Sequence, residues 1–461
     1  MPKFAKRFLI GATIILVVPV LILLCINVYL QSSGVQERIR NAAADAIGAD
    51  IQIQSTTYTP WEGLVLKGIS IPDSTTPDSN ALEAAALRIR FSLGPLFQKR
   101  FVVTECALFE PRLIIRQMDN GNWIVPLMPR VKPAPTEEIS PEPSSARGAS
   151  FAAELQRLRL GSGEIAFIDA RKRTVLLLER TDIDATLTPE MTAEGRIAIS
   201  RMKLGNSLQL RRIESPFTWD GSALDVPKIQ GQLAGGELTG RYHIRTGTAP
   251  AFALTAELKN ILLRKLADEA GIEPGKTDGK LQGTLTIQGD PRQTEGLSGN
   301  GRLELIEAKL KPVEFLSRLG ELFQIDELQL LKLGDAWINL TIGNGQVNVD
   351  ELFLQSENLI IRGKGPVHFN GKLNLEAKLL INQKLHNQLK SLLGKNFVES
   401  EDPEYRELPF TVKGTVARPK TDILKKLTNI SLDGDVGGFL QNILRAIPRQ
   451  DAGKDGGKEG K

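Results

Sequence analysis

The sequence predicts a mainly β protein with a single N-terminal transmembrane helix, followed by a long, antiparallel, curved sheet that forms a groove, and a few short helices. Three observations lead to this prediction. One long apolar run lies near the N-terminus, apolar and polar residues alternate with a period of two through most of the remaining chain, and 42 Gly and 25 Pro supply frequent turns. The pattern therefore indicates an anchored sheet protein.

The strongest single feature is the apolar run from Phe8 to Leu30. A helix needs about 20 apolar residues to cross a bilayer, so residues 8–30 are predicted to form a transmembrane anchor. Lys3, Lys6 and Arg7 precede this run, and the positive-inside rule therefore places residues 1–7 in the cytoplasm and the bulk of the chain on the other side. A cleaved signal peptide is the alternative, but its apolar region is about 7–15 residues long and ends in small residues.

The length, charge and cysteine content of the chain limit the classes of protein to which it can belong. The 461 residues are too many for one ordinary core, so several modules or a repeated unit are expected. With 58 basic and 54 acidic residues, the charge is too balanced to predict a nucleic-acid partner. The two cysteines, Cys25 in the apolar run and Cys106 in a strand-like segment, are expected to lie apart and not to pair.

Behind the anchor the sequence predicts one helix and then strands. Val35–Ile47 has apolar residues at helical spacing, and Gly48 follows it as a stop signal. In Leu87–Leu93 the odd positions are apolar and the even ones are not, which is typical of a strand with one dry face. These segments make up a predicted N-terminal β module over residues 31–128, with further strands expected at Ile51–Ile53, Gly63–Ile71, Phe101–Phe109 and Arg112–Gln117.

Residues 129–150 are rich in Pro, Ser and Glu and are predicted to be a linker, because they hold too few large apolar residues to form a core. A second, repeating β-groove module is predicted for residues 151–435. Few helical segments separate its strands, so antiparallel pairing of consecutive strands is expected. The strand candidates before residue 310 are Glu164–Ile168, Thr174–Leu178, Arg196–Ser200, Gln230–Leu233, Glu237–Ile244, Phe252–Leu258, Lys280–Ile287 and Gly301–Ile306.

The clearest strand pattern runs from Trp337 to Ile381, where alternating segments are separated by Gly, Asn or Asp turns, as in a meander. In its last segment every second residue from Leu373 to Ile381 is apolar, so those side chains share one face. An amphipathic helix is predicted at residues 436–447, ended by Pro448, and a disordered tail at 448–461. Other helix candidates are Asn260–Ala270, Val313–Phe323 and Lys384–Leu393.

Residues that could carry out catalysis are sparse. The three histidines, His243, His368 and His386, fall in separate segments, and no H-E-x-x-H or C-x-x-C spacing occurs. Residues 271–277 resemble a phosphate-binding loop but are one residue short, and a helix candidate precedes them where a strand is required. The sequence therefore predicts no enzyme activity, no metal and no cofactor.

Several segments, taken in order, resemble the AsmA-like family of membrane-anchored envelope proteins, which are related to chorein-type lipid-transfer proteins with repeating β-groove architecture. The N-terminal resemblance lies in the anchor and in Ala46–Gly48, Ile51–Ile53, Trp61–Leu64, Leu66–Ile71, Glu110–Leu113 and Asn120–Trp123. The C-terminal resemblance lies in Gly345–Val349, Leu359–Leu380 and Leu408–Pro419.

This resemblance implies a single-pass inner-membrane protein with a cytoplasmic N-terminus, whose bulk lies in the periplasm of a diderm bacterium. It implies that an apolar groove conducts phospholipid acyl chains between the inner and outer membranes. The expected partners are the inner membrane, phospholipid acyl chains, and outer-membrane or periplasmic proteins, but no nucleic acid. The residues expected to line the groove are Leu352, Leu354, Leu373, Leu375, Leu379 and Ile381.

Two alternatives remain open at this point. A sheet with one apolar face must cover that face with helices, with a second sheet as in a β-sandwich, or with a molecule that is not protein. The few helix candidates are too short to cover so many strands, which leaves the sandwich and the lipid groove. The second functional hypothesis is a membrane-tethered scaffold or assembly factor for outer-membrane proteins that acts by strand addition.

Overall fold

The computed structural model describes residues 24–25, 27–47, 50–73, 76, 79–92, 101–119, 121–124, 153–188, 190, 192–205, 208–247, 249–271, 277–311, 317, 320–321, 325–389, 396–416 and 418–428. Most of the predicted anchor, the linker 129–150, the helix 436–447 and the tail 448–461 lie outside these ranges. No helix within them is long and apolar enough to cross a membrane. The two cysteines are free, as expected.

The described chain is mainly β, which confirms the predicted class, and its contacts divide it into two compact units. The first comprises Met1–Pro274, Gly279–Glu304 and Leu340–Gln346, and the second comprises Gly275–Asp278, Leu305–Asn339 and Val347–Lys461. Within the described ranges the helical elements are α2 (Ser33–Ile47), α3 (Leu263–Glu269), η2 (Thr294–Gly296), α5 (Asp326–Gln329), α6 (Gln383–Leu389) and α7 (Ile423–Thr428), and residues 24–25 and 27–30 are also helical.

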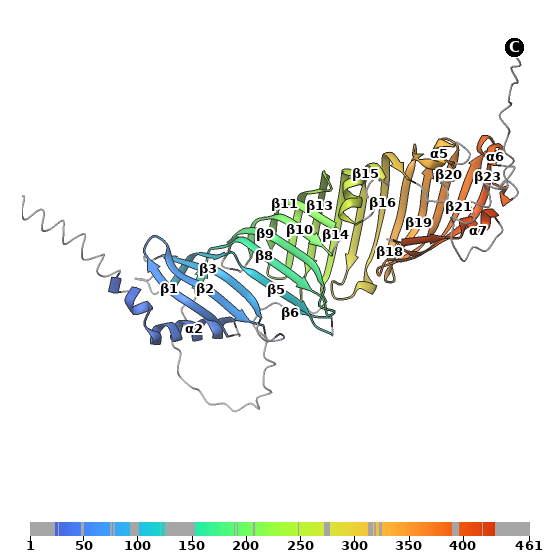
Figure 1. Ribbon diagram of the computed structural model, residues 1–461. Helices are drawn as coiled ribbons and strands as arrows, with labels where there is room; N and C mark the ends of the chain where they lie inside the picture. The colour runs from blue at the N-terminus through green and yellow to red at the C-terminus, as the bar shows by residue number, and fades with distance from the viewer. Residues whose placement is uncertain are drawn as a thin grey trace, which may run out of the picture. The chain divides into compact units, whose positions relative to one another are not determined.

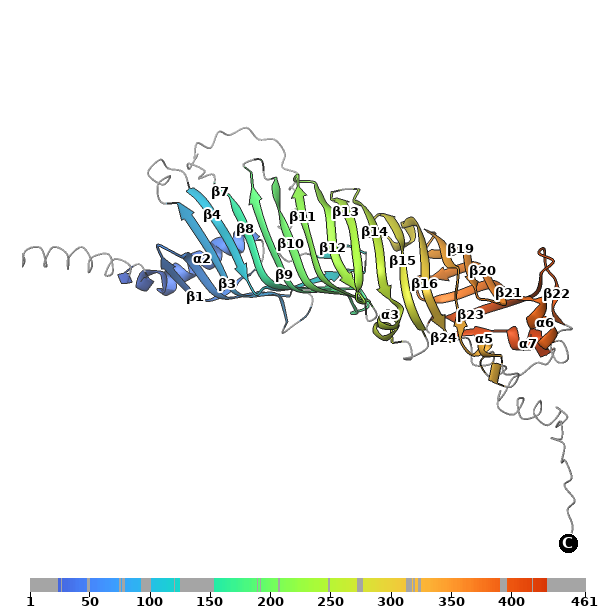
Figure 2. The same ribbon diagram turned by 90° about the horizontal axis from the view of Figure 1, so that it is seen from above.

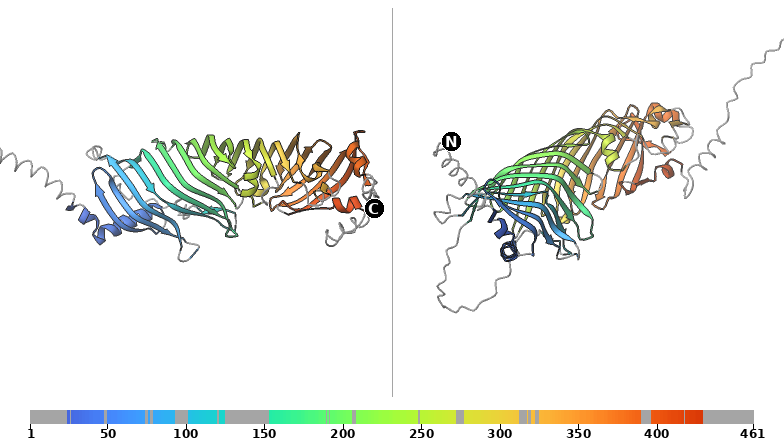
Figure 3. Two further views of the ribbon diagram at one scale, coloured as in Figure 1. Left: turned by 45° about the horizontal axis from the view of Figure 1, so that its top comes forward. Right: turned by 60° about the vertical axis from the view of Figure 1, so that its left-hand side comes forward.

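The first unit is a curved and twisted sheet whose strands lie side by side (Figures 2 and 3). Helix α2 packs across the first strands, where Ile39 and Ala44 contact a buried apolar cluster (Figure 1). The strands that fall mainly in this unit are β1 (Gln52–Thr59), β2 (Gly63–Pro72), β3 (Asn80–Ser92), β4 (Phe101–Phe109), β5 (Arg112–Gln117), β6 (Trp123–Ile124), β7 (Ala153–Leu155), β8 (Arg157–Ile168), β9 (Thr174–Leu187), β10 (Ala193–Leu204), β11 (Leu208–Trp219), β12 (Ala223–Leu233), β13 (Gly236–Arg245), β14 (Ala251–Leu262), β15 (Thr277–Gly289) and β16 (Ser298–Leu310).

Pairing in the first unit is mostly antiparallel between consecutive strands, as expected, but it is not so throughout. Strand β4 pairs in parallel with β7 and β8, and β5 pairs in parallel with β8. The prediction of a purely antiparallel sheet is therefore wrong at this point. A parallel pair needs a long crossover, and the connection between β6 and β7 is the longest one in the first unit.

A row of left-handed backbone positions crosses neighbouring strands of the first unit. Gly68, Glu110, Ser162, Arg180 and Arg212 have φ values of 60°, 47°, 53°, 50° and 50°. Each lies in or beside a strand that continues past it in the same sheet. Such an irregularity works as a β-bulge, which reverses the side to which the following side chains point.

Strand β9 shows the consequence of this reversal. Leu176 and Leu178 lie before Arg180 at even positions, whereas Ile183 and Ala185 lie after it at odd positions. Without the reversal the two pairs would point to opposite faces. The residue at the bulge therefore lets one long strand keep its apolar side chains on a single face.

The second unit contains most of the meander predicted from the sequence, although Leu340–Gln346, which include half of β18, belong to the first unit (Figure 1). Strand β21 pairs antiparallel with β20 and with β23, and helices α6 and α7 pack against β23. Its strands include β17 (Leu331–Lys332), β18 (Ala336–Gly343), β19 (Gln346–Gln355), β20 (Leu359–His368), β21 (Lys372–Asn382), β22 (Val398–Glu399), β23 (Tyr405–Thr415) and β24 (Arg418–Thr421).

The predicted helices compare well with the described ones where they can be compared. Helix α2 confirms Val35–Ile47, and α6 confirms the first part of Lys384–Leu393. Within Asn260–Ala270 the helix begins only at Leu263, because β14 continues to Leu262. Most of Val313–Phe323 lies outside the described residues.

Candidate functional site

One face of the first unit carries rows of apolar side chains that run across the strands. Residues opposite one another on paired strands point to the same face, so the strand register defines each row. We call such a row an apolar ladder. The first ladder crosses six strands, from β2 through β3, β4, β8 and β9 to β10, and consists of Leu66, Leu87, Leu108, Leu160, Ile183 and Ile197.

Further ladders run parallel to the first on the other side of the row of bulges. The second consists of Leu113, Ile165, Leu178, Met202 and Leu210, and the third of Ile115, Phe167, Leu176, Leu204 and Leu208. Ile197 of the first ladder and Met202 of the second pack against the same buried cluster, which places both ladders on one face. We call this surface the apolar face.

The apolar face continues over later strands of the first unit. On β13, β14 and β15 the residues Tyr242, Leu254 and Ile287 form another ladder. The intervening residues Thr255 and Glu257 on β14 are exposed, so the alternation is clean. Burial of the Tyr242 ring raises the pKa of its hydroxyl. The face is therefore apolar from β2 to β15.

Most side chains on the apolar face are only half-buried. Leu178, Met202 and Leu254 are all in this class, and Leu204 is 39% exposed. The main contacts of β8, β9 and β10 in the described first unit are with neighbouring strands of the same sheet, and α3 contacts β11 and β14. A β-sandwich, in which a second sheet covers the face, is therefore not what these strands form. This half-exposed apolar surface is therefore the candidate binding site of the first unit.

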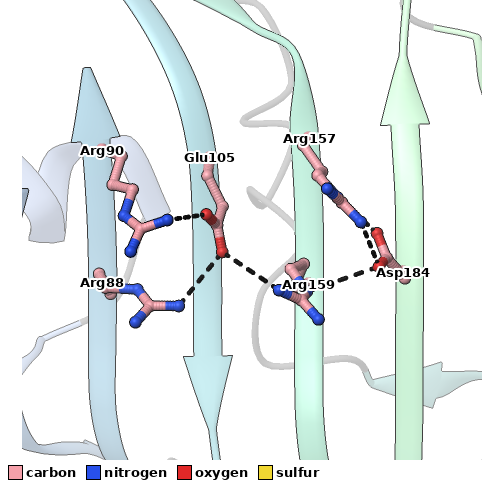
Figure 4. Close-up of polar contacts among 6 residues, drawn as sticks. All are labelled: Arg88, Arg90, Glu105, Arg157, Arg159 and Asp184. Atoms are coloured by element: carbon pink, nitrogen blue, oxygen red, sulfur yellow. Dashed lines mark hydrogen bonds and ion pairs between the residues drawn. The ribbon is translucent and has the colours of Figure 1, made fainter. Parts of the chain in front are cut away.

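The opposite face of the same strands carries a network of ion pairs, whose six residues are drawn in Figure 4. Glu105 accepts hydrogen bonds from Arg90 at 2.9 Å and from Arg88 at 3.3 Å, although it is only 8% exposed. Arg159 reaches both acids, lying 3.8 Å from Glu105 and 3.5 Å from Asp184. This network spans β3, β4, β8 and β9, and so it joins the two sides of the parallel β4–β8 pair.

Asp184 forms the second centre of the network. Arg157 donates two hydrogen bonds to it, at 2.7 Å and 2.6 Å, and these hold the pKa of the Asp184 carboxyl below its ordinary value. Asp182 and Asp184 both lie on this polar side, where Asp182 accepts a hydrogen bond from the backbone of Ser162. Both carboxylates therefore have hydrogen-bond partners within the sheet.

In the second unit the structure places the six predicted lining residues in two groups. Leu352, Leu354, Leu373 and Leu375 are half-buried. Leu379 and Ile381, in contrast, are 3% and 1% exposed, because they lie in the part of β21 that leads into α6, where the helix packs against the sheet. A bound molecule would therefore reach the first four residues and not the last two. Their role in binding stays a prediction.

A cavity of about 520 Å³ opens beside the half-buried group. Gly363, Ala377 and Phe410 are opposite one another on β20, β21 and β23 and form its floor, together with Leu352. A side chain at Gly363 would begin 3.4 Å from Leu352 Cδ2, so glycine leaves this space open. Two charged residues line the edge of the cavity, namely Asp422, directly before α7, and Lys426, within α7. The cavity thus combines an apolar floor with a rim that carries both acidic and basic side chains.

The described residues contain no group of three or more metal-binding side chains. Among the histidines, His243 lies 3.5 Å from Asp225 on an exposed part of the sheet, and His386 contacts the ring of Phe397 edge-on. These two histidines lie on different elements, β13 and α6.

Comparison of the chain with protein-family models, with curated proteins and with solved structures found no match. Sequence reasoning located the half-buried residues of β19 and β21 and predicted a dry face for Leu87–Leu93, but it named no lining residue in the first unit. Residues of its apolar face were present in the strand candidates Thr174–Leu178 and Arg196–Ser200. Each candidate covered only half of its strand, because the alternation of apolar and polar residues is reversed in the other half.

Proposed function

We propose that this chain is a non-enzymatic, membrane-anchored periplasmic protein that binds or conducts phospholipid acyl chains along its apolar faces, and so contributes to lipid transport between the inner and outer membranes. The observation that supports this proposal best is the set of half-exposed apolar ladders in the first unit, opposite a charged face. Such a surface offers contact to a flexible hydrocarbon chain over many strands.

The energetics favour a hydrocarbon occupant. Burial of each CH₂ group contributes about 0.8 kcal/mol, so contact with several ladders gives appreciable binding without a specific polar site. The side chains of the first three ladders are Leu, Ile, Met and Phe, which offer no hydrogen bonds that a headgroup could use. Selectivity for the headgroup is therefore expected to be low along the ladders.

Site-specific photo-crosslinking in living cells tests the proposal. A photoreactive residue in place of Leu254 or Leu375 is expected to capture phospholipid, because both side chains belong to apolar, half-buried positions. The matched controls are the exposed neighbours Thr255 and Asn374, which point to the other face of the same strands. Equal lipid capture at all four positions would contradict the proposal.

Native mass spectrometry of the detergent-extracted full chain gives an independent test. We expect phospholipid to remain bound after extraction, and a well-folded but empty protein would count against the proposal. Crosslinks to a folding outer-membrane protein, without any to lipid, would favour the scaffold hypothesis instead.

A further inference from the structure

The first edge strand is held by a side chain from the end of the predicted anchor. Asn27 donates a hydrogen bond from Nδ2 to the backbone oxygen of Tyr58 at 2.8 Å, and accepts one at Oδ1 from the backbone nitrogen of Tyr58, also at 2.8 Å. Its amide therefore pairs with β1 as a neighbouring strand would. This double contact fixes the short helical stretch around Asn27 against the end of β1.

The turn that follows Tyr58 exposes a tryptophan. Trp61 lies between β1 and β2 and is 68% exposed, and the turn is closed by a hydrogen bond from the backbone of Glu62 to Thr59 Oγ1 at 3.2 Å. Tryptophan is a large, mostly apolar residue, and so wide an exposure is unusual in a folded domain. Its position in the fold therefore needs an explanation.

Three further apolar side chains are exposed next to the Asn27 contact. Leu24 and Val28, four residues apart in the helical stretch, are 60% and 64% exposed, and Tyr29 is 62% exposed. All three belong to the apolar run that ends at Leu30. Tyrosine and tryptophan are enriched at the level of the lipid headgroups, where the ring is in contact with apolar groups and its polar atom with water.

We propose that Leu24, Val28, Tyr29 and Trp61 form one membrane-docking surface, which seats the β1–β2 turn in the headgroup region of a phospholipid bilayer. Asn27 is the positioning residue, because its pairing with Tyr58 holds the turn beside the chain that leaves the membrane. The anchor alone would tether the sheet at any angle. The second contact through Trp61 fixes one end of the sheet at the bilayer surface.

This docking surface also places the apolar face at the membrane. Tyr58 lies opposite Leu64, which lies opposite Ile89 and then Cys106, so a ladder begins at the residue that Asn27 holds. The Tyr58 ring stacks on Phe91, with centroids 5.8 Å apart. The docking proposal rests on the membrane-anchored part of the proposed function but not on lipid carriage.

Fluorescence quenching of the full chain in vesicles tests the docking surface. The protein is reconstituted in vesicles of phosphatidylethanolamine and phosphatidylglycerol at a ratio of about 3 to 1, with a fraction of the lipids brominated near the headgroup or near the chain end. The difference in emission between the native protein and its Trp61→Phe variant isolates the Trp61 signal. We expect shallow bromines to quench this signal more than deep ones, and a blue shift relative to a water-exposed tryptophan.

An Asn27→Ala variant tests the positioning role. Its Trp61 signal is expected to lose most of the shallow quenching, whereas Asn27→Asp, which can still accept from the Tyr58 nitrogen, is expected to retain part of it. A Trp61 signal with the emission of water-exposed tryptophan and no quenching would overturn the proposal. Shielding from an aqueous quencher without quenching by brominated lipid would overturn it as well, since it would indicate a protein partner.

Lipid loading, measured by native mass spectrometry on the same samples, separates the two proposals. Docking without bound phospholipid would contradict lipid carriage alone. Bound phospholipid without quenching of Trp61 would contradict the docking surface alone.

Discussion

Replacing Met202 with Arg tests whether the apolar face of the first unit holds acyl chains. Met202 lies half-buried on β10, between Leu178 on β9 and Leu210 on β11. Neighbouring strands are about 4.8 Å apart, so about four methylene groups of an extended acyl chain lie over one strand. If Arg at position 202 removes the contact of these methylene groups with β10, binding loses about 3 kcal/mol and is weakened about a hundredfold. The long stem of Arg can lie along the sheet, so the strand pairing should persist.

The assay compares lipid occupancy of three full-length proteins by native mass spectrometry. If half of the native protein is loaded, Met202→Arg is expected to reduce the loaded fraction to about 1%. Ser200→Arg is the matched control, because Ser200 is an exposed residue of the same strand. Circular dichroism should show that all three proteins are folded. Equal loading of Met202→Arg and Ser200→Arg would refute the reasoning.

Four further predictions concern what holds the fold together, and each is measured as a shift of the urea-unfolding transition. Glu105→Gln leaves the guanidinium groups of Arg88 and Arg90 without their shared carboxylate. Because these groups are partly exposed, the loss of stability should be only about 1–2 kcal/mol. Raising the salt concentration should reduce the difference in stability between the variant and the native protein. Leu385→Ala truncates a side chain of α6 that is only 1% exposed and should cost about 2–4 kcal/mol. Arg180→Val places a β-branched residue at a φ of 50°, which adds to the strain that Arg180 already carries and should destabilise the fold, whereas Arg180→Gly relieves that strain and should not. A hydrogen bond from Lys203 lowers the pKa of Glu179 in the folded protein. The stability that the ionised Glu179 contributes is therefore complete above its unfolded-state pKa of about 4.3 and is lost as the pH falls through its folded-state pKa. Glu179→Gln should weaken this dependence of stability on acid pH.

Three outcomes would contradict these predictions. A Glu105→Gln protein as stable as the native one at low salt would show that the network contributes nothing. Equal effects of Arg180→Val and Arg180→Gly would show that the left-handed backbone is not the constraint. An acid transition that is unchanged in Glu179→Gln would mean that other carboxylates control it.

The second unit could be predicted well because its strands follow a simple rule. From Lys372 to Lys378 the exposed residues alternate with half-buried or buried ones, as the sequence pattern indicated. The pattern could not show that Leu379 and Ile381 are buried rather than accessible. That depends on the packing of α6, which is a tertiary contact. The alternation therefore predicted which side chains share a face of the sheet, but not which part of that face a helix covers.

The first unit was harder to predict because its strands break the rule. The strand candidate Thr174–Leu178 stops where the alternation reverses, whereas β9 continues to Leu187. A glycine at the reversal would have given a turn signal, but the residue there is Arg180. The parallel pairing of β4 with β8 was also beyond the sequence pattern, because it depends on where a long connection returns.

The placement of the bulges bears on what the apolar face is for. Ser162, Arg180 and Arg212 lie on β8, β9 and β11, and Gly163 pairs with Thr181, which in turn pairs with Ile199 and, through it, with Ile213. The three positions thus lie at the same level of the sheet across β8 to β11. If only one strand reversed, its leucines would point toward the charged network on the other side. Coordinated reversal keeps one face apolar over both halves of long strands, although the main contacts of these strands are within their own sheet. An occupant that needs such continuity must itself be long and apolar, and an acyl chain has both properties.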